Sequence, residues 1–131
     1  MRGLLNRVFG NRGERTAARY LRRQGLKILH RQYRDRLGEI DLIARDGDWL
    51  VFVEVKTRKS NAAGSPAEAV TFTKQQQLTK LALAYLKRYN LLEHAARFDV
   101  VAIIWPEGRG KPEITHYRNA FEPVGIGQMF S

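Results

Sequence analysis

The chain has 131 residues, 44% of them hydrophobic and 27% charged, a composition typical of one globular domain. It contains no cysteine, which excludes disulfide bonds and zinc sites built from thiolates. Lysine and arginine total 23 against 13 acidic residues, so the formal net charge is +10 and polyanions are attracted. Nucleic acid is the partner that this charge favours, and a plain basic surface or an anionic membrane are the alternatives. No apolar run has the length of a signal peptide or a membrane span, so we expect a cytoplasmic protein that does not contact the membrane.

The first predicted element is a helix between Asn11 and Gly25. Asn11 and Glu14 have the spacing of a capping box at its start, and Gly25 is a typical residue after a helix end. A strand is expected at residues 26–33. Residues 38–45 and 49–57 are also strand-like, and the Asp46-Gly47 pair between them is a strong signal for a hairpin.

The second half of the chain predicts another helix and further strands. Ser65 followed by Pro66 looks like a helix start, and residues 73–89 form an amphipathic helix that Asn90 ends. Residues 98–105 are an apolar run typical of a buried strand, and residues 113–118 suggest an edge strand. This order predicts an α/β fold, with a central mixed sheet flanked by helices. We expect a single domain at residues 1–120 and a loose tail at residues 121–131.

The predicted hairpin brings acidic side chains together. If Asp46 and Gly47 form the turn, Asp41 lies opposite Phe52 and diagonal to Glu54. Side chains alternate along a strand, so one face is apolar and must be covered by another layer. The other face carries Glu39, Asp41, Ile43, Leu50, Phe52, Glu54 and Lys56. A slip of one residue would place Asp41 and Glu54 on different faces.

These carboxylates repel one another and resist burial unless a cation lies between them. A hard divalent ion would take oxygen ligands from Asp41 and Glu54, and a third from the backbone carbonyl of Val55. Lys56 would then stand beside the attacking water and hold it or help to deprotonate it. The alternative is a surface hairpin in which Glu54 and Lys56 form an ordinary ion pair. Glu54 follows the run Trp-Leu-Val-Phe-Val, where charge is costly, and this weakens the alternative.

Asp41, a hairpin and then Glu54-Val55-Lys56 resemble the PD-(D/E)XK motif of the restriction-endonuclease-like nucleases, although the residue before Asp41 is isoleucine rather than proline. More closely, residues 11–105 resemble the YraN-like family of small bacterial proteins. The segments that carry this likeness are Gly13-Glu14 and residues 38–43, 51–58 and 97–101. The resemblance implies a restriction-endonuclease-like αβββαβ core, similar to archaeal Holliday-junction resolvases, and a predicted endonuclease activity.

The resemblance also suggests roles for other residues. Resolvases use a glutamate of the first helix near the metal, and Glu14 is the matching position, with helix capping as an equal alternative. Glu39 is expected to support the metal ligands or to replace one. Lys74 and Gln75 resemble residues that reach the active site or a phosphate, and a solvated helix position is the alternative for Gln75.

We further expect Thr57 and Arg58, which follow Lys56, to contact a phosphate, with a flexible loop arginine as the alternative. The basic first helix, with Arg15 and Arg19, is expected to hold the nucleic-acid backbone. Arg97 and Asp99 flank a buried strand and suggest a structural ion pair.

The leading hypothesis is a DNA phosphodiesterase that depends on Mg²⁺ or Mn²⁺. Backbone contacts do not read sequence, so selectivity for branched DNA is expected, and paired cuts favour a homodimer. The rival hypotheses are a non-catalytic nucleic-acid-binding module on the same fold and an adaptor whose basic surface binds an acidic protein.

Overall fold

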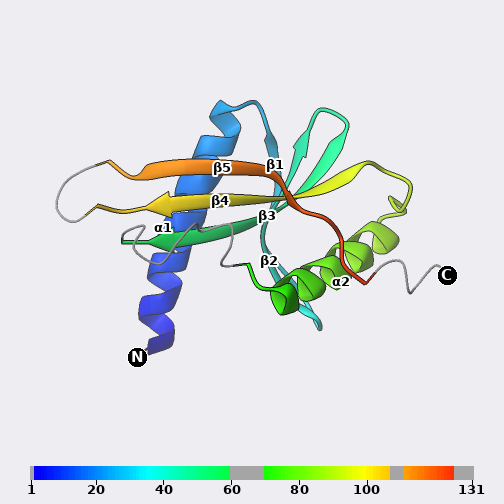
Figure 1. Ribbon diagram of the computed structural model, residues 1–131, viewed down its shortest axis with the longest axis horizontal. Helices are drawn as coiled ribbons and strands as arrows, with labels where there is room; N and C mark the ends of the chain where they lie inside the picture. The colour runs from blue at the N-terminus through cyan, green and yellow to red at the C-terminus, as the bar shows by residue number, and fades with distance from the viewer. Residues whose placement is uncertain (1, 60–69, 107–110, 126–131) are drawn as a thin grey trace.

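The computed structural model describes residues 2–59, 70–106 and 111–125, with residues 2–11 described by their backbone alone. One five-stranded sheet has the strand order β1-β2-β3-β4-β5; β3 and β4 are parallel and the other neighbours antiparallel. The α/β fold with a mixed central sheet is therefore confirmed (Figure 1). The elements in chain order are α1 Arg2–Arg23, β1 Lys27–Asp35, β2 Gly38–Asp46, β3 Trp49–Arg58, α2 Phe72–Arg88, β4 Ala96–Ile104 and β5 Glu113–Phe121.

Helix α1 starts earlier than its sequence signals predicted. It begins at Arg2, so Asn11 lies inside the helix and the capping box of Asn11 with Glu14 is wrong. Residues 2–10 contain no proline, so nothing in them prevents the helix from extending beyond the local capping signal. The end is as predicted: Gly25 has φ +94°, and the Leu26 N–H donates to the Leu21 carbonyl at 3.0 Å, as in a Schellman motif.

The two helices cover opposite faces of the sheet. Ala17, Ala18 and Leu21 of α1 are buried, and they pack against a cluster from the sheet made of Leu42, Ala44, Val51, Val53, Val101 and Ile103. On the other face α2 packs with Leu78, Leu81 and Tyr85, and the strands contribute Ile40, Ile43, Leu50, Phe52, Phe98 and Val100. The predicted apolar face of the hairpin is thus covered by α1.

The register of the β2–β3 hairpin differs from the prediction. Asp46 pairs with Trp49, so the turn is Gly47-Asp48 instead of Asp46-Gly47. Gly47 has φ +59° at the first central position, as a type II′ turn requires. The change moves the pairing by one residue on each strand, which preserves the alternation of side chains near the turn. Ile43 and Phe52 consequently still share one face.

A second irregularity concerns Ile40, which strict alternation along β2 would place on the same face as Leu42. Ile40 packs with Ile43 on the α2 face, while Leu42 packs on the α1 face, so the alternation of side chains breaks between residues 40 and 42. On the neighbouring strand, Gln32 lies between the pairs Arg31–Leu42 and Tyr33–Ile40 and has φ +50°. This irregular backbone leaves Asp41 at the point where β2 bends.

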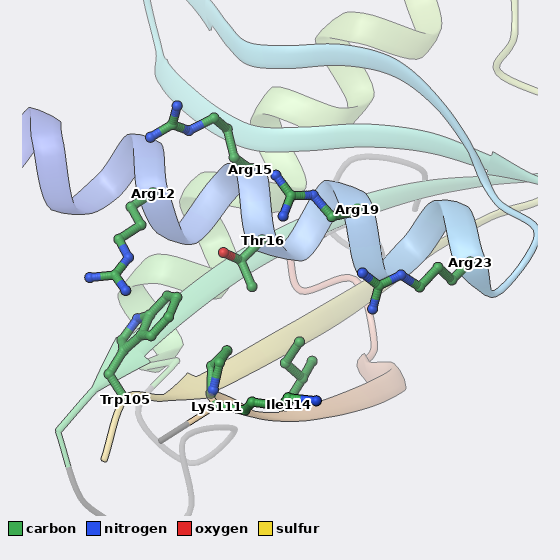
Figure 2. Close-up of a pocket in the computed structure, with 9 residues that line it drawn as sticks. Arg12, Arg15, Thr16, Arg19, Arg23, Trp105, Lys111 and Ile114 are labelled. Carbon is green, nitrogen blue, oxygen red and sulfur yellow. The ribbon is translucent and has the colours of Figure 1, made fainter. Parts of the chain in front are cut away.

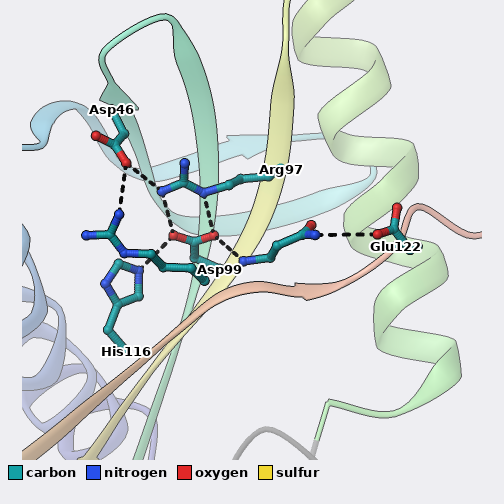
Figure 3. A network of polar contacts seen from close by, with 7 residues as sticks. Asp46, Arg97, Asp99, His116 and Glu122 are labelled. Carbon is teal, nitrogen blue, oxygen red and sulfur yellow. Dashed lines mark hydrogen bonds and ion pairs between the residues drawn. The ribbon is translucent and has the colours of Figure 1, made fainter.

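The predicted Arg97–Asp99 ion pair is confirmed and forms part of a buried network (Figure 3). Asp99 is fully buried, and its carboxylate lies 3.0 Å from Arg97 Nε and 2.7 Å from His116 Nε2. It also accepts a hydrogen bond from the Asn119 N–H at 2.9 Å. Arg97 reaches Asp46 at 2.8 Å as well, so the network joins β4 and β5 to the turn end of β2.

Helix α2 begins one residue before the predicted start. Its N-cap is Thr71, whose Oγ1 accepts a hydrogen bond from the Lys74 N–H at 3.2 Å. Asn90 has φ +57° just after the C-cap, as expected for a residue that ends a helix. The helix start expected at residues 65–68 lies outside the described residues. Strand β5 runs to Phe121, beyond the predicted end at residue 118. Within the described ranges, neither helix has a stretch long and apolar enough to cross a membrane.

Candidate metal centre

Asp41 and Glu54 lie side by side where β2 and β3 part. Leu42 and Val53 are the last backbone pair between these strands, so Asp41 and Glu54 are the next residues along each of them. Asp41 Oδ2 accepts a hydrogen bond from the Val55 N–H at 2.8 Å. The side chain of Asp41 therefore takes the place of a backbone acceptor at the edge of the pairing. Asp41 is a direct neighbour of Glu54, rather than a diagonal one as the predicted register required.

Two further carboxylates join this point from α1 and β2. One oxygen each of Glu14, Glu39 and Asp41 lies within 4.8 Å of the others. Glu14 is only 9% exposed, since α1 approaches the end of β3 closely at the preceding residue. A Cβ atom at Gly13 would lie 2.6 Å from Thr57 Cγ2, so the glycine permits this approach. We call Glu14, Glu39, Asp41 and Glu54 the carboxylate cluster.

Burial makes Glu14, Asp41 and Glu54 costly to ionise. Burial, followed by the neighbouring charge of Glu54, raises the pKa of Asp41 to about 7. Burial followed by the charge of Glu39 raises the pKa of Glu14. The pKa of Glu54 is raised by burial as well, although Lys74 and Lys56 oppose the increase. Without an added cation, the folded protein holds protons that isolated carboxyl groups would release at neutral pH.

Glu54 has an oxygen that the described part of the chain does not satisfy. Its side chain is 7% exposed, and Oε1 lies 3.6 Å from Lys56 Nζ. Oε2 is buried and has no hydrogen-bond partner among the described residues. Such an orphan costs free energy, and a cation would remove the cost. The donor set consists of carboxylate oxygens from three elements, which fits a hard divalent ion such as Mg²⁺ or Mn²⁺.

The other predicted site residues differ in how they relate to this cluster. Lys74, at the start of α2, lowers the cost of ionising both Asp41 and Glu54. The cluster is therefore approached by lysines of two elements, Lys56 of β3 and Lys74 of α2. Thr57 is exposed on β3, next to Gly13. The carbonyl of Arg58 accepts a hydrogen bond from the Trp105 N–H at 2.9 Å. The side-chain amide of Gln75 donates a hydrogen bond to the Val70 carbonyl at 2.9 Å, which ties Gln75 to the segment just before α2.

Arg15 and Arg19 lie elsewhere, in a groove of about 600 Å³ between α1 and the ends of β4 and β5 (Figure 2). The arginines lie along the helix, and Trp105 and Lys111 lie on the strand side of the groove. We call this the basic groove; it is lined by Arg12, Arg15, Thr16, Arg19, Arg23, Trp105, Lys111, Pro112 and Ile114.

Some of these residues were missed by the sequence analysis. The spacing of Arg12, Arg15, Arg19 and Arg23, by three or four residues, indicates one helical face and was a usable signal. Trp105 and Lys111 carry no such signal, because only the packing of the strands on α1 brings them there. Gly13 was noticed as part of a motif, but its role as the contact point of α1 with β3 depends on the fold.

Comparison with known proteins identifies relatives across most of the chain. The model of the uncharacterised protein family UPF0102 matches residues 13–103, a span that includes the whole carboxylate cluster. A UPF0102 protein of Rhodococcus opacus (strain B4) is 51% identical over 116 residues, covering 88% of this chain and 98% of the relative. A Geobacter sulfurreducens relative is 50% identical over 119 residues, with 89% and 91% covered. One of Rhodopirellula baltica is 45% identical over 128 residues, with 95% and 77% covered.

Proposed function

The chain belongs to the uncharacterised protein family UPF0102, as its likeness to YraN-like proteins indicated, and we propose that it is a metal-dependent endonuclease that hydrolyses phosphodiester bonds of DNA. The observation that carries the proposal is the buried, unpartnered Oε2 atom of Glu54 beside three carboxylates that are buried or partly buried. A purely structural site would be expected to pair that oxygen, as the carboxylate of Asp99 is paired on the neighbouring strand β4. Membership of the PD-(D/E)XK superfamily is part of the same proposal.

Glu14, Glu39, Asp41 and Glu54 would hold the ion, either Mg²⁺ or Mn²⁺, and the Val55 carbonyl is a proposed further ligand. When bound, the ion supplies positive charge that neutralises the cluster and stabilises the negative charge developing on the phosphate. Of the two roles expected for Glu39, support of the ligands or replacement of one, we propose the role of a ligand, because one of its oxygens lies within 4.8 Å of oxygens of Glu14 and Asp41.

The protein's own residues then orient the reactants. The half-buried ammonium group of Lys56 is held beside Glu54, where it can donate a hydrogen bond to the attacking water and keep it in line. Lys74 adds positive charge from the α2 side, toward which the scissile phosphate would be drawn. Thr57 and Arg58 follow Lys56 on β3 and are proposed to contact the adjacent phosphate.

Contacts of this kind recognise the nucleic-acid backbone and its shape rather than its sequence. We therefore propose a structure-selective enzyme whose substrates are branched DNA molecules, with DNA preferred to RNA. Symmetrical cleavage of a branched substrate needs two active sites, so a homodimer is part of the proposal. A binding module that lacks catalysis is the competing outcome of the test below.

The test compares the wild type with Asp41→Asn and with Asp48→Asn, a matched control at an exposed position in the β2–β3 turn. Branched, flapped and linear DNA are incubated with each protein in manganese, and again in EDTA. We expect wild type and Asp48→Asn to cleave in manganese alone, and Asp41→Asn to bind DNA without cleaving it. Equal cleavage by Asp41→Asn, or DNA binding without cleavage by the wild type, overturns the nuclease proposal.

Metal binding can be measured separately by titration calorimetry. We expect the wild type to bind Mn²⁺ and Glu54→Gln to bind it at least tenfold more weakly, since loss of one ligand charge weakens a carboxylate site. Equal affinity in the two proteins would place the metal elsewhere and overturn the assignment of Glu54 as a ligand.

A further inference from the structure

The basic groove is a second binding feature that catalysis at the carboxylate cluster does not explain. Its lining includes four arginines of α1 and Lys111, and the described residues that line it include no acidic side chain. Arg12, Arg15 and Arg19 are exposed, and so is Arg23. Like charges gathered on one face of a helix repel one another, so an anionic partner would relieve this repulsion.

The groove also has an aromatic wall. The guanidinium carbon of Arg12 lies 3.9 Å from the ring centre of Trp105, which is a cation–π contact. Trp105 is half-buried, so its ring borders the groove without being enclosed. A positively charged groove with an aromatic side chain is the arrangement by which proteins hold single-stranded nucleic acid, with the backbone along the cations and a base on the ring.

The shape of the surface separates this partner from the other polyanions. The arginines from Arg12 to Arg23 extend over about 16 Å at 1.5 Å per residue, a line that suits a polymer lying along the helix. A membrane or a rigid duplex would meet the rims of a hollow of about 600 Å³ without reaching its wall, whereas a flexible strand can enter it.

The groove and the carboxylate cluster are linked by two elements, α1 and β3. Glu14 lies between Arg12 and Arg15 in the sequence of α1, and the Trp105 N–H donates to the carbonyl of Arg58, two residues after Lys56. A strand that lies in the groove would therefore follow the helix that carries Glu14 and pass the end of β3, the strand that carries Glu54 and Lys56.

We propose that the basic groove binds a single-stranded segment of the substrate, which makes nucleic acids with an unpaired arm next to a duplex the preferred substrates. The inference rests on the proposed function only in taking nucleic acid as the substrate. It is tested by binding in EDTA, where cleavage cannot contribute.

The test measures fluorescence anisotropy with a labelled oligothymidine, a blunt duplex and a duplex with a single-stranded tail. Arg19→Gln is compared with Arg22→Gln, a substitution of another exposed arginine of α1 that lies outside the groove. Both variants lose one positive charge, so a diffuse electrostatic effect is the same in each. Circular dichroism checks that both proteins remain folded.

We expect Arg19→Gln to weaken binding of oligothymidine by about tenfold, the cost of one charge-assisted contact, while Arg22→Gln changes it less than twofold. The slope of log affinity against log salt concentration should fall by about 0.7 for Arg19→Gln, as for the loss of one phosphate contact to a single strand. Trp105→Leu should reduce the preference for the tailed duplex over the blunt one by roughly fivefold or more, as loss of one stacked base does.

Equal effects of Arg19→Gln and Arg22→Gln would overturn the groove as a specific site. So would equal binding of blunt and tailed duplexes by the wild type, or displacement of the oligonucleotide by anionic vesicles or polyglutamate at matched charge. These results leave the nuclease proposal standing if manganese-dependent cleavage remains. Conversely, if Asp41→Asn cleaves as well as the wild type, the nuclease proposal fails. The groove proposal still stands in that case, provided that the groove binds the oligonucleotide as expected.

Discussion

Replacing Asp41 by asparagine should make the metal-free protein more stable at pH 8. The substitution preserves the shape of the side chain and an oxygen that can accept the Val55 N–H, but it removes the buried charge. The pKa of Asp41 is about 7 in the folded protein, against 3.8 for an ordinary aspartate. At 1.36 kcal/mol per pKa unit, ionised Asp41 lowers the free energy of unfolding by about 4 kcal/mol.

The sign follows from the direction of the shift. A group whose folded pKa is raised stabilises the protein fully below the unfolded pKa, near 3.8, and this stability is lost as the pH rises through about 7. Asparagine does not titrate, so the variant avoids the loss. Between pH 5 and pH 8 the stability of the variant relative to the wild type should rise by about 3 kcal/mol.

The measurement is urea unfolding followed by tryptophan fluorescence, at pH 5 and pH 8 in EDTA, with Asp48→Asn as the control that should show no such change. With saturating manganese the wild type should gain about 3 kcal/mol at a metal concentration of 100 times Kd, and the variant should gain much less. A stability difference between Asp41→Asn and wild type that is the same at both pH values would refute the reasoning. So would a variant that is less stable than wild type at pH 8.

Three other changes probe the surroundings of the cluster. Glu14→Gln should also raise the apparent melting temperature in EDTA at pH 8, because the raised pKa of Glu14 has the same sign, and should weaken manganese binding in calorimetry. Gly13→Ala should lower the free energy of unfolding in urea by about 1–3 kcal/mol, despite the better helix propensity of alanine. Adding Thr57→Ser to this variant should restore most of the lost stability, because it removes the methyl group that the new Cβ meets. Asp99→Asn should lower the free energy of unfolding by about 2–3 kcal/mol, because the buried Arg97 loses one of its two carboxylate partners and keeps Asp46. The pKa of Asp99 is lowered, so its contribution is present above pH 3.8 and lost as the pH falls through the folded pKa; the difference in stability should therefore shrink in acid.

Much of the fold was predictable because it depends on local alternation. The β2 and β3 segments alternate apolar residues for two different faces, and both faces are covered by helices as that pattern requires. The turn was less certain, because Asp46, Gly47 and Asp48 offer two neighbouring pairs of turn residues. Glycine in the second central position suits a type I′ turn, and glycine in the first suits a type II′ turn. The structure adopts the type II′ turn, with Gly47 in the first position.

The position of Asp41 depended on information that the local sequence does not carry. Its place beside Glu54 follows from the shifted register. The neighbouring break in alternation at Ile40 is matched by the left-handed backbone of Gln32 on another strand. Glu14 was recognised by family likeness alone, since its capping signal pointed to a different role. In the structure it lies well inside α1, so the capping explanation no longer competes with the metal-site one.

Helix α1 links the cluster to the basic groove, and this has a kinetic consequence. Glu14 is buried toward the sheet, whereas Arg12 and Arg15 are exposed and line the groove only two residues before and one residue after it. Charge in the groove can therefore steer and hold a strand without touching the reacting phosphate. If both proposals hold, Arg19→Gln should lower kcat/KM and its salt dependence while leaving kcat within about twofold, since contacts made equally in the ground and transition states act on KM. A fall in kcat with unchanged KM would show instead that the groove takes part in the chemical step, and would join the two features into one site.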